Sequence, residues 1–168
     1  VLNGFLWFFL PISKPKRVFV TSSTHPGNFG GLIAGNGICQ GLANAAGLLG
    51  SWEAWLSTST PLVDAKDIIL NTEYRRLDNV VVANNKADLI DGTIDNPINR
   101  DQNNNAVTAS TEVWTGTHSN GTRDATCTSW TSTSVNGDVG NTNSTGTSWT
   151  EFGHTTCSDS NRIYCFEQ

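Results

Sequence analysis

Apolar positions between residues 35 and 57 change from a helical to an alternating period, which predicts a helix, a turn and a strand. Ile38, Leu42 and Ala45 recur at the spacing of one helix face, and two glycines follow where a helix usually ends. From Trp52 to Leu56 every second residue is apolar, as in a strand with one buried face, and Trp55 is the one apolar exception among the alternate positions. The other predicted strands and loops lie before and after this helix, turn and strand.

Shorter apolar runs predict further strands separated by polar loops. Val18, Phe19 and Val20 follow one another within residues 16–23, as in a short strand that is buried on both faces. Residues 68–77 fit either a short strand or a helix. Further strands are predicted at residues 80–83, 111–117, 127–131 and 162–167. Loops rich in glycine, asparagine, aspartate, serine or threonine are predicted at residues 25–31, 84–105 and 135–148.

Residues 1–15 do not continue this pattern and are predicted to lie outside the domain formed by residues 16–168. The run FLWFFL at residues 5–10 is much shorter than the ~20 apolar residues of a membrane-spanning helix, so no membrane-spanning segment is expected. An apolar run of this kind is expected to be covered. Two alternatives are open: a first strand packed on its own domain, or a docking strand for self-association or for another subunit.

Composition narrows the class of protein and of partner. The chain has 168 residues, enough for one domain, and its six tryptophans and seven phenylalanines supply bulky core candidates. Charged residues make up 15% of the chain, and the formal net charge is -5. Binding to nucleic acid needs clustered lysine and arginine, so no nucleic-acid partner is expected.

The four cysteines form no CxxC pair and lack the spacing of a zinc site; they are Cys39, Cys127, Cys157 and Cys165. An even number of cysteines predicts two disulfide bonds, for which three pairings are open. Disulfides form in oxidising compartments, so we expect an extracellular or cell-surface location. The alternative, a reactive thiol, would need a cysteine beside a histidine in a basic environment.

The predicted loop at residues 84–105 is the best candidate for a binding site. Calcium takes about 6–8 oxygen ligands from aspartate, asparagine and backbone carbonyls, and the loop is dense in both side chains. The alternative is that these side chains cap turns of the loop's own backbone. The candidate ligand-binding residues of the loop are Asp88, Asp91, Asp95, Asn96 and Asn99, and the candidate calcium ligands are Asp88, Asp91, Asp95 and Asp101. No cofactor other than calcium is indicated.

Beyond the basic run at residues 14–17, Arg75 and Arg76 are the only adjacent basic residues, and we add them to the candidate ligand-binding residues. The alternative is a solvated pair that meets neighbouring carboxylates. The three later tryptophans are expected in the core, although an exposed one beside the loop would favour stacking on a glycan; they are Trp114, Trp130 and Trp149.

The histidines are scattered along the chain, at His25, His118 and His154. No serine or cysteine nucleophile has a recognisable partner motif, so the sequence predicts a protein that is not an enzyme.

Three segments resemble endostatin, the C-terminal domain of collagen XVIII. They are ICQGLANAAGLLGSWEAWLS, VWTGTHSNGTRDATCTSW and the closing CSDSNRIYCFEQ. The opening KRVFVTSSTHPGNFGGL and the segment ADLIDGTIDNPIN are more similar to the bacterial endostatin-like domain of leptospiral surface proteins. The resemblance covers residues 16–168 in order and with compatible spacing.

The resemblance implies a C-type-lectin-like α+β fold, in which one or two helices pack on a twisted, mostly antiparallel sheet with long loops. It also implies two nested disulfides, Cys39–Cys165 and Cys127–Cys157. The calcium motifs EPN, QPD and WND of sugar-binding relatives are missing, and residues 96–99 are only a loose echo of them. The arginine-rich heparin surface and the N-terminal zinc-binding histidines of endostatin have no counterpart either.

In the leptospiral relatives the resemblance implies adhesion. We therefore expect a non-enzymatic extracellular or cell-surface binding module whose partner is an extracellular matrix protein, a host surface protein or a glycan. One alternative is a structural subunit or decorating protein of an extracellular fibre, docked through residues 1–15. A further alternative is a calcium-dependent lectin.

Overall fold

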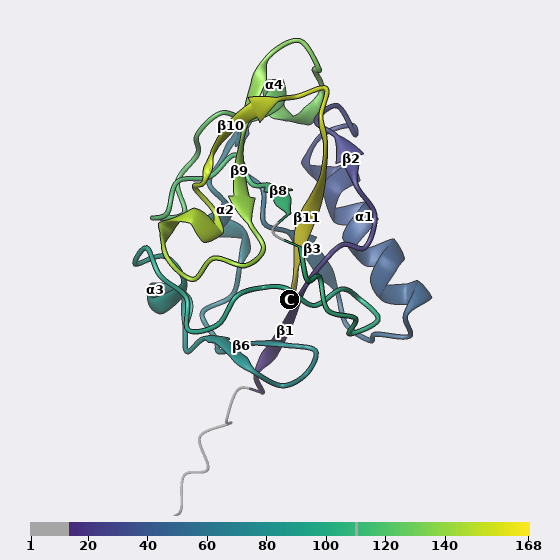
Figure 1. Cartoon of the computed structure of the whole chain (residues 1–168), viewed down its shortest axis with the longest axis vertical. Coiled ribbons are helices and arrows are strands. Elements are labelled where there is room, and N and C mark those ends of the chain that lie inside the picture. The colour runs from purple at the N-terminus through teal and green to yellow at the C-terminus, as the bar shows by residue number, and fades with distance from the viewer. Residues whose placement is uncertain (1–13, 110) are drawn as a thin grey trace, which may run out of the picture.

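The last strand of the chain, β11, is the centre of the fold (Figure 1). The computed structural model describes residues 14–109 and 111–168, which form a mixed α+β structure with one long helix. The strands are β1 (Lys16–Val20), β2 (His25–Pro26), β3 (Trp52–Ala54), β4 (Thr58–Ser59), β5 (Leu62–Val63), β6 (Tyr74–Arg76), β7 (Val81–Ala83), β8 (Glu112–Trp114), β9 (Asn136–Asn141), β10 (Gly153–Thr156) and β11 (Ser160–Glu167). The helices are α1 (Leu32–Ala45), α2 (Ala65–Ile68), α3 (Lys86–Leu89), α4 (Cys127–Trp130) and the 3-10 helix η1 (Thr147–Trp149).

Most neighbouring strands of the large sheet run antiparallel. The strand order is β10-β9-β8-β11-β1-β6-β7, and β2 and β3 also pair with β11. The parallel pairs among the described strands are β1 with β6 and β8 with β11. β4 and β5 form a separate two-stranded hairpin. The predicted α+β class with a mostly antiparallel sheet is therefore confirmed.

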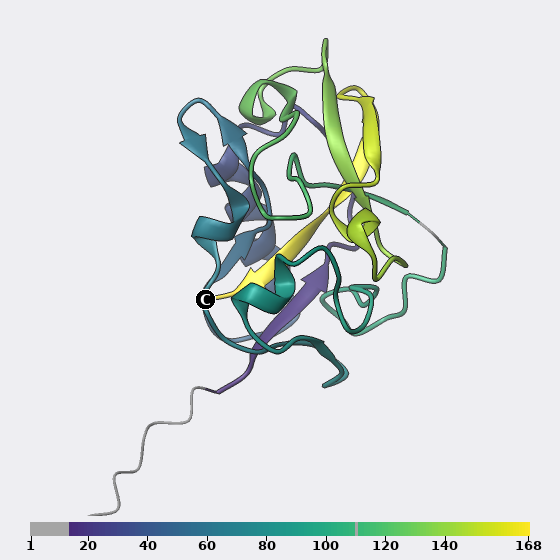
Figure 2. The ribbon, with the colours of Figure 1, turned by 90° about the vertical axis from the view of Figure 1, so that its left-hand side faces the viewer.

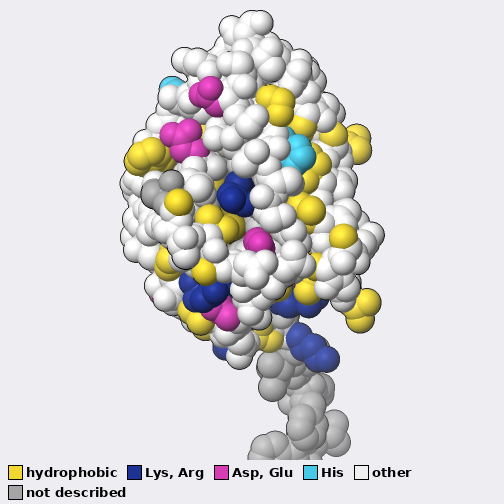
Figure 3. Space-filling model, turned by 45° about the vertical axis from the view of Figure 1, so that its right-hand side comes forward, with side chains coloured by type: hydrophobic (Ala, Val, Ile, Leu, Met, Phe, Trp, Pro, Cys, Tyr) yellow, Lys and Arg dark blue, Asp and Glu magenta, His cyan; other side chains and the backbone are white. Residues whose placement is uncertain are grey.

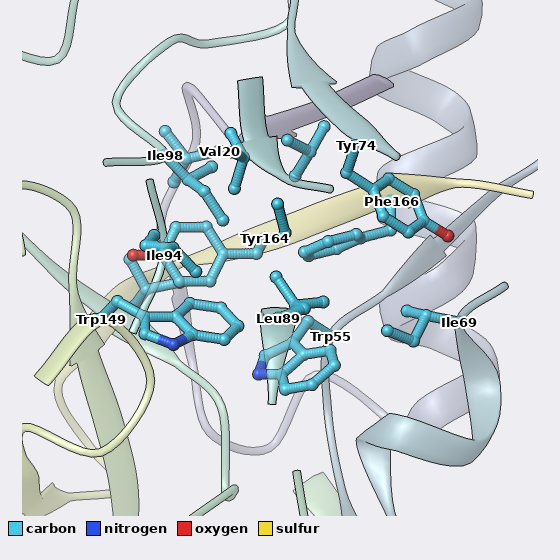
Figure 4. Packing of buried hydrophobic residues seen from close by; sticks show 14 of the residues in the cluster. Val20, Trp55, Ile69, Tyr74, Leu89, Ile94, Ile98, Trp149, Tyr164 and Phe166 are labelled. Atoms are coloured by element: carbon cyan, nitrogen blue, oxygen red, sulfur yellow. The ribbon is translucent and has the colours of Figure 1, made fainter. Parts of the chain in front are cut away.

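Both faces of β11 are buried, and each face belongs to a different core cluster. Tyr164 and Phe166 pack in a cluster with Trp55 and Trp149, whose rings lie 5.1 Å apart between centroids (Figure 4). Ile163 belongs to the cluster on the opposite face, together with the cysteines. Because side chains alternate along a strand, this single strand contributes to both clusters.

β1 lies beside β11 and is buried on both faces, as the sequence predicts. Val18, Phe19 and Val20 are all 0% exposed, and Phe19 packs in the other cluster from the two valines. The run of β-branched and aromatic residues is thus the signature of a strand between two core layers.

α1 starts at Leu32, ahead of the predicted stretch, and packs on β3 through small residues. Gly35, Cys39 and Ala43 are its buried residues and recur at one helical turn. A Cβ atom at Gly35 would lie 2.8 Å from Cδ1 of Leu56, so a larger residue here would have to displace the Leu56 side chain or the helix. The predicted order of helix, turn and strand is confirmed.

Two disulfide bonds join segments that are distant in the sequence. Cys39 of α1 is bonded to Cys165 of β11, and Cys127 of α4 is bonded to Cys157. The nested pairing that the resemblance implies is therefore confirmed.

Two of the predicted elements are wrong. Residues 127–131 do not form a strand: the four residues of α4 have φ angles of 50° to 66°, a left-handed turn. Residues 135–148 are not a loop throughout, because β9 lies there. A Cβ atom at Gly137 would be 2.5 Å from Sγ of Cys127, and one at Gly140 would overlap the backbone of Trp149. The close neighbours thus require glycine at these two positions. Glycines in the strand interrupt the alternation of apolar and polar residues by which a strand is recognised in a sequence.

Smaller corrections concern the regions around β6 and β7. Residues 68–77 contain the end of α2 and the strand β6, so the helix and the strand that were considered for this segment are each present in part. The long loop at residues 84–105 includes the short helix α3.

The predicted docking strand at residues 1–15 lies outside the described residues, except for Lys14 and Pro15. Within the described ranges, no helix is both long and apolar enough to cross a membrane.

Candidate functional site

A hollow of about 450 Å³ opens where the start of α1, the β4–β5 hairpin and α4 meet. Apolar side chains, including Leu32, Pro61 and Val63, form much of its wall. Hydroxyl groups are added from the hairpin and from the α4 side, among them those of Thr60 and Thr131. A concave apolar surface with a few polar groups is the usual form of a ligand site.

The left-handed turn of α4 shapes one side of this hollow. A left-handed conformation costs roughly 1–2 kcal/mol for each L-residue, and α4 has four of them in succession. The turn is held by the Cys127–Cys157 bond and by Trp130, which is buried and donates from Nε1 to the Ser57 carbonyl at 2.8 Å. Strained backbone that surrounding structure maintains in this way is concentrated at functional sites.

The same turn also fixes the two other sides of the hollow. The Ser129 hydroxyl accepts hydrogen bonds from the backbone N–H groups of Ser59 and Thr60 in the β4–β5 hairpin, at 3.0 and 2.9 Å. Figure 2 shows the ribbon of this hairpin near that of α4. The Trp130 carbonyl accepts from the N–H groups of Gly30 and Gly31 just before α1. The hollow is therefore preformed by contacts between three distant segments.

Large apolar side chains stand exposed beside the hollow. Ile33, which lines it, is 88% exposed, and Leu62, the first residue of β5, is 67% exposed. Exposed aliphatic side chains around an apolar depression are typical of interaction surfaces.

The predicted pair Arg75 and Arg76 lies at a second, basic hollow of about 310 Å³, which Lys14, Lys16 and Arg17 also line. Half of the chain's ten lysines and arginines thus gather around one depression of an acidic protein. Figure 3 shows basic side chains at the lower end of its face, with acidic ones between them.

Carboxylates neutralise part of this basic charge. Arg75 pairs with Glu73, and Arg76 donates to Asp78 at 2.8 and 3.0 Å. Burial raises the pKa of Asp78, but the hydrogen bonds and charge of Arg76 outweigh this effect and leave that pKa below its ordinary value. Both arginines therefore contact neighbouring carboxylates, which was the alternative to a ligand-binding role for this pair.

The structure brings only some of the predicted loop residues together. Asp88 and Asp95 both accept from the side-chain amide of Asn84, at 3.0 and 2.9 Å. Asp91 accepts from the N–H and hydroxyl of Thr93 within its own turn.

The remaining loop candidates bond elsewhere. Asn96 donates to the Val81 carbonyl, and Asn99 accepts from Arg76 at 2.7 Å. Asp101 is buried and accepts from the N–H groups two and four residues further on. The contacts of Asp101 match the alternative of turn capping, while Asn96 and Asn99 bond other segments. Calcium binding in the loop stays a prediction.

The tryptophans that were considered as a glycan platform are in the core. Trp114, Trp130 and Trp149 are 0% exposed, as expected for packing residues.

One cluster of polar side chains was not predicted from the sequence. Asp124, Asp138 and His154 offer ligand atoms that all lie within 4.8 Å of one another, and they form the only such group of His, Cys, Asp and Glu in the described part of the chain. His118 lies beside them, with Nδ1 3.8 Å from Asp124 Oδ2. No motif marks these residues, because the pairing of β9 with β10 brings them together.

The fold and the hollow define a disulfide-linked α+β domain with a preformed surface site. The chain belongs to the family described as "Protein of unknown function (DUF1554)", whose model matches residues 22–145. The match includes every residue that lines the hollow. A comparison with curated proteins finds no match.

Proposed function

We propose that the protein is a non-enzymatic binding module of the extracellular space or the cell surface, and that it holds its ligand in the hollow beside α4. The observation that carries this proposal is the preformed hollow itself, built on a strained turn that is fixed to the hairpin, the start of α1 and a disulfide. A site that exists before binding loses little conformational entropy when it binds.

The chemistry of the walls supports recognition and gives no support to catalysis. Apolar side chains suit the C–H face of a sugar or an apolar side chain of a protein ligand, and hydroxyl groups can both donate and accept hydrogen bonds. None of the described residues that line the hollow is an acid, a base, a histidine or a cysteine. Acid–base or nucleophilic chemistry would need such a group.

The two disulfides support the proposed location. Structural disulfides persist in oxidising compartments, and all four cysteines are paired. The expected partner remains an extracellular matrix protein, a host surface protein or a glycan, as the resemblance to adhesive endostatin-like domains implies.

The test is a glycan array together with a panel of purified matrix proteins, both probed with the protein in calcium and again in EDTA. Ile33→Asp places a charge on the rim of the hollow, and Leu49→Asp is the matched control, because Leu49 is 83% exposed and does not line the hollow. We expect Ile33→Asp to weaken any detected ligand roughly tenfold or more, since desolvating a charge opposes binding. Leu49→Asp should bind as the wild type, and both variants should melt at the wild-type temperature.

Other outcomes would redirect the assignment. Equal binding by wild type and Ile33→Asp would remove the hollow from consideration. Glycan binding that is lost in EDTA would favour the calcium-dependent lectin and the loop at residues 84–105. An array and a panel without binding would shift the weight to the structural subunit, which is tested by the native mass of a variant lacking residues 1–15.

A further inference from the structure

The β9–β10 hairpin places an aspartate directly opposite a histidine. Asp138 of β9 and His154 of β10 are cross-strand partners, so their Cβ atoms lie on the same face at close range. Figure 2 shows the two strands side by side. Asp124 is held next to them, because its N–H donates to the Gly116 carbonyl at 2.7 Å and the neighbouring Ala125 carbonyl accepts from the N–H of Asp138 at 2.8 Å. Backbone pairing therefore fixes all three residues.

Asp138 is the least expected member of this group. It is 1% exposed, and its Oδ1 accepts from the N–H of Val139, but its Oδ2 is buried without any hydrogen-bond partner. A buried carboxylate oxygen without a partner is costly, and a cation is one group that would satisfy it.

We propose that Asp124, Asp138 and His154 bind a divalent transition-metal ion, for which zinc is the best chemical match. Zinc binds histidine nitrogen and carboxylate oxygen in tetrahedral sites with bonds of about 2.0–2.2 Å, which puts ligand atoms roughly 3.3 Å apart. His154 Nε2 lies 2.9 Å from Asp124 Oδ2, so a small rotation of the exposed imidazole makes room for the ion. This inference stands independently of the proposed function.

The surroundings match those of a metal site with three protein ligands. Zinc and related ions accept a water molecule as the fourth ligand, and the 49% exposed side chain of His154 leaves one side open to solvent. His118 Nδ1 is bonded to Glu151 at 3.0 Å and lies 3.8 Å from Asp124. Calcium fits less well, since it prefers a larger set of oxygen ligands.

The site is distinct from the other candidates on the chain. Both disulfides are formed, so no thiol competes for the metal. The loop at residues 84–105 contributes none of the three ligands.

The experiment is a titration of the full chain, freed of metal with EDTA and dialysed, with zinc chloride in a calorimeter and with cobalt chloride in a spectrophotometer. We expect one zinc ion per chain and visible absorption bands of low-symmetry cobalt. His154→Ala and Asp138→Asn should each weaken zinc binding about 100-fold and abolish the cobalt bands. His25→Ala is the matched control, because His25 lies outside the cluster, and it should bind as the wild type.

His154→Ala keeps the test decisive if Asp138→Asn does not fold, because His154 is exposed and its backbone pairing remains. The absence of zinc binding by the wild type would overturn the proposal. Equal weakening by His154→Ala and His25→Ala would do the same, since it would indicate unspecific binding to surface histidines.

Discussion

The α4 end of the molecule differs from Asp91 and Asp101, near its β6–β7 end, in how polar side chains are held. At the α4 end, Ser129 bonds the distant β4–β5 hairpin, and Asp138 meets His154 across two strands. At the β6–β7 end, Asp91 and Asp101 bond residues only two to four positions away. These two aspartates of the dense polar loop therefore cap local turns, while the isolated polar residues near α4 come together through tertiary structure.

The strongest test of this difference removes the Cys127–Cys157 bond in a double alanine variant. The cysteines are separated by 30 residues, so the chain-entropy model gives a loss of about 3–4 kcal/mol in the free energy of unfolding. The left-handed turn should relax as well, and binding at the hollow should be lost. Urea denaturation measures the first effect. A loss below about 1 kcal/mol would contradict the stabilising role of the bond.

Ser129→Ala removes one hydroxyl that joins two segments. The N–H groups of Ser59 and Thr60 lose their acceptor, so we expect a loss of about 1–3 kcal/mol in urea denaturation. Ser134→Ala is the control, because Ser134 is exposed on the following segment. Equal stability of the two variants would contradict the bridging role of Ser129.

A smaller effect is expected for the ion pair beside the basic hollow. Burial raises the pKa of Glu167, but hydrogen bonds from Arg17 outweigh this and leave it below the ordinary value of 4.5. The stabilisation is therefore present above pH 4.5 and is lost as the pH falls through the depressed pKa. Glu167→Gln should flatten this acidic part of the stability profile, measured by thermal melts from pH 7 to pH 2. An unchanged profile would exclude the pair as its source.

The smallest effect is expected in the loop at residues 84–105. Asp91 is exposed and bonds only its own turn among the contacts described, so Asp91→Ala should change stability by no more than about 0.5 kcal/mol. The melting temperature is then measured with and without calcium. A rise with calcium in the wild type that is absent in Asp91→Ala would support the calcium-ligand role predicted for this loop.

The spacing of apolar residues along the sequence was enough to predict the elements whose buried faces follow that spacing. The helix and strand around residues 35–57 and the buried strand β1 were predicted because their apolar spacing reflects the core directly. The disulfide pairing came from the resemblance, since spacing alone left three choices.

The missed features depend on distant neighbours. Cys127, Thr128 and Trp130 favour a strand by composition, and only their tertiary contacts hold them in a left-handed turn. The Asp138–His154 pairing depends on the register of a strand whose glycines conceal it. The neighbouring residues in the sequence carry no pattern that would indicate the left-handed turn or the Asp138–His154 pair.

The central position of β11 also bears on how the protein is made. A ribosome completes Ser160–Glu167 only after β1, β3 and β8, which all pair with it, have been synthesised. Until then these strands lack their common neighbour, and Cys39 has no Cys165 to join. The β8–β9–β10 and β1–β6–β7 groups can therefore join into one sheet only after β11 is made, and until then Cys39 is open to incorrect thiol partners.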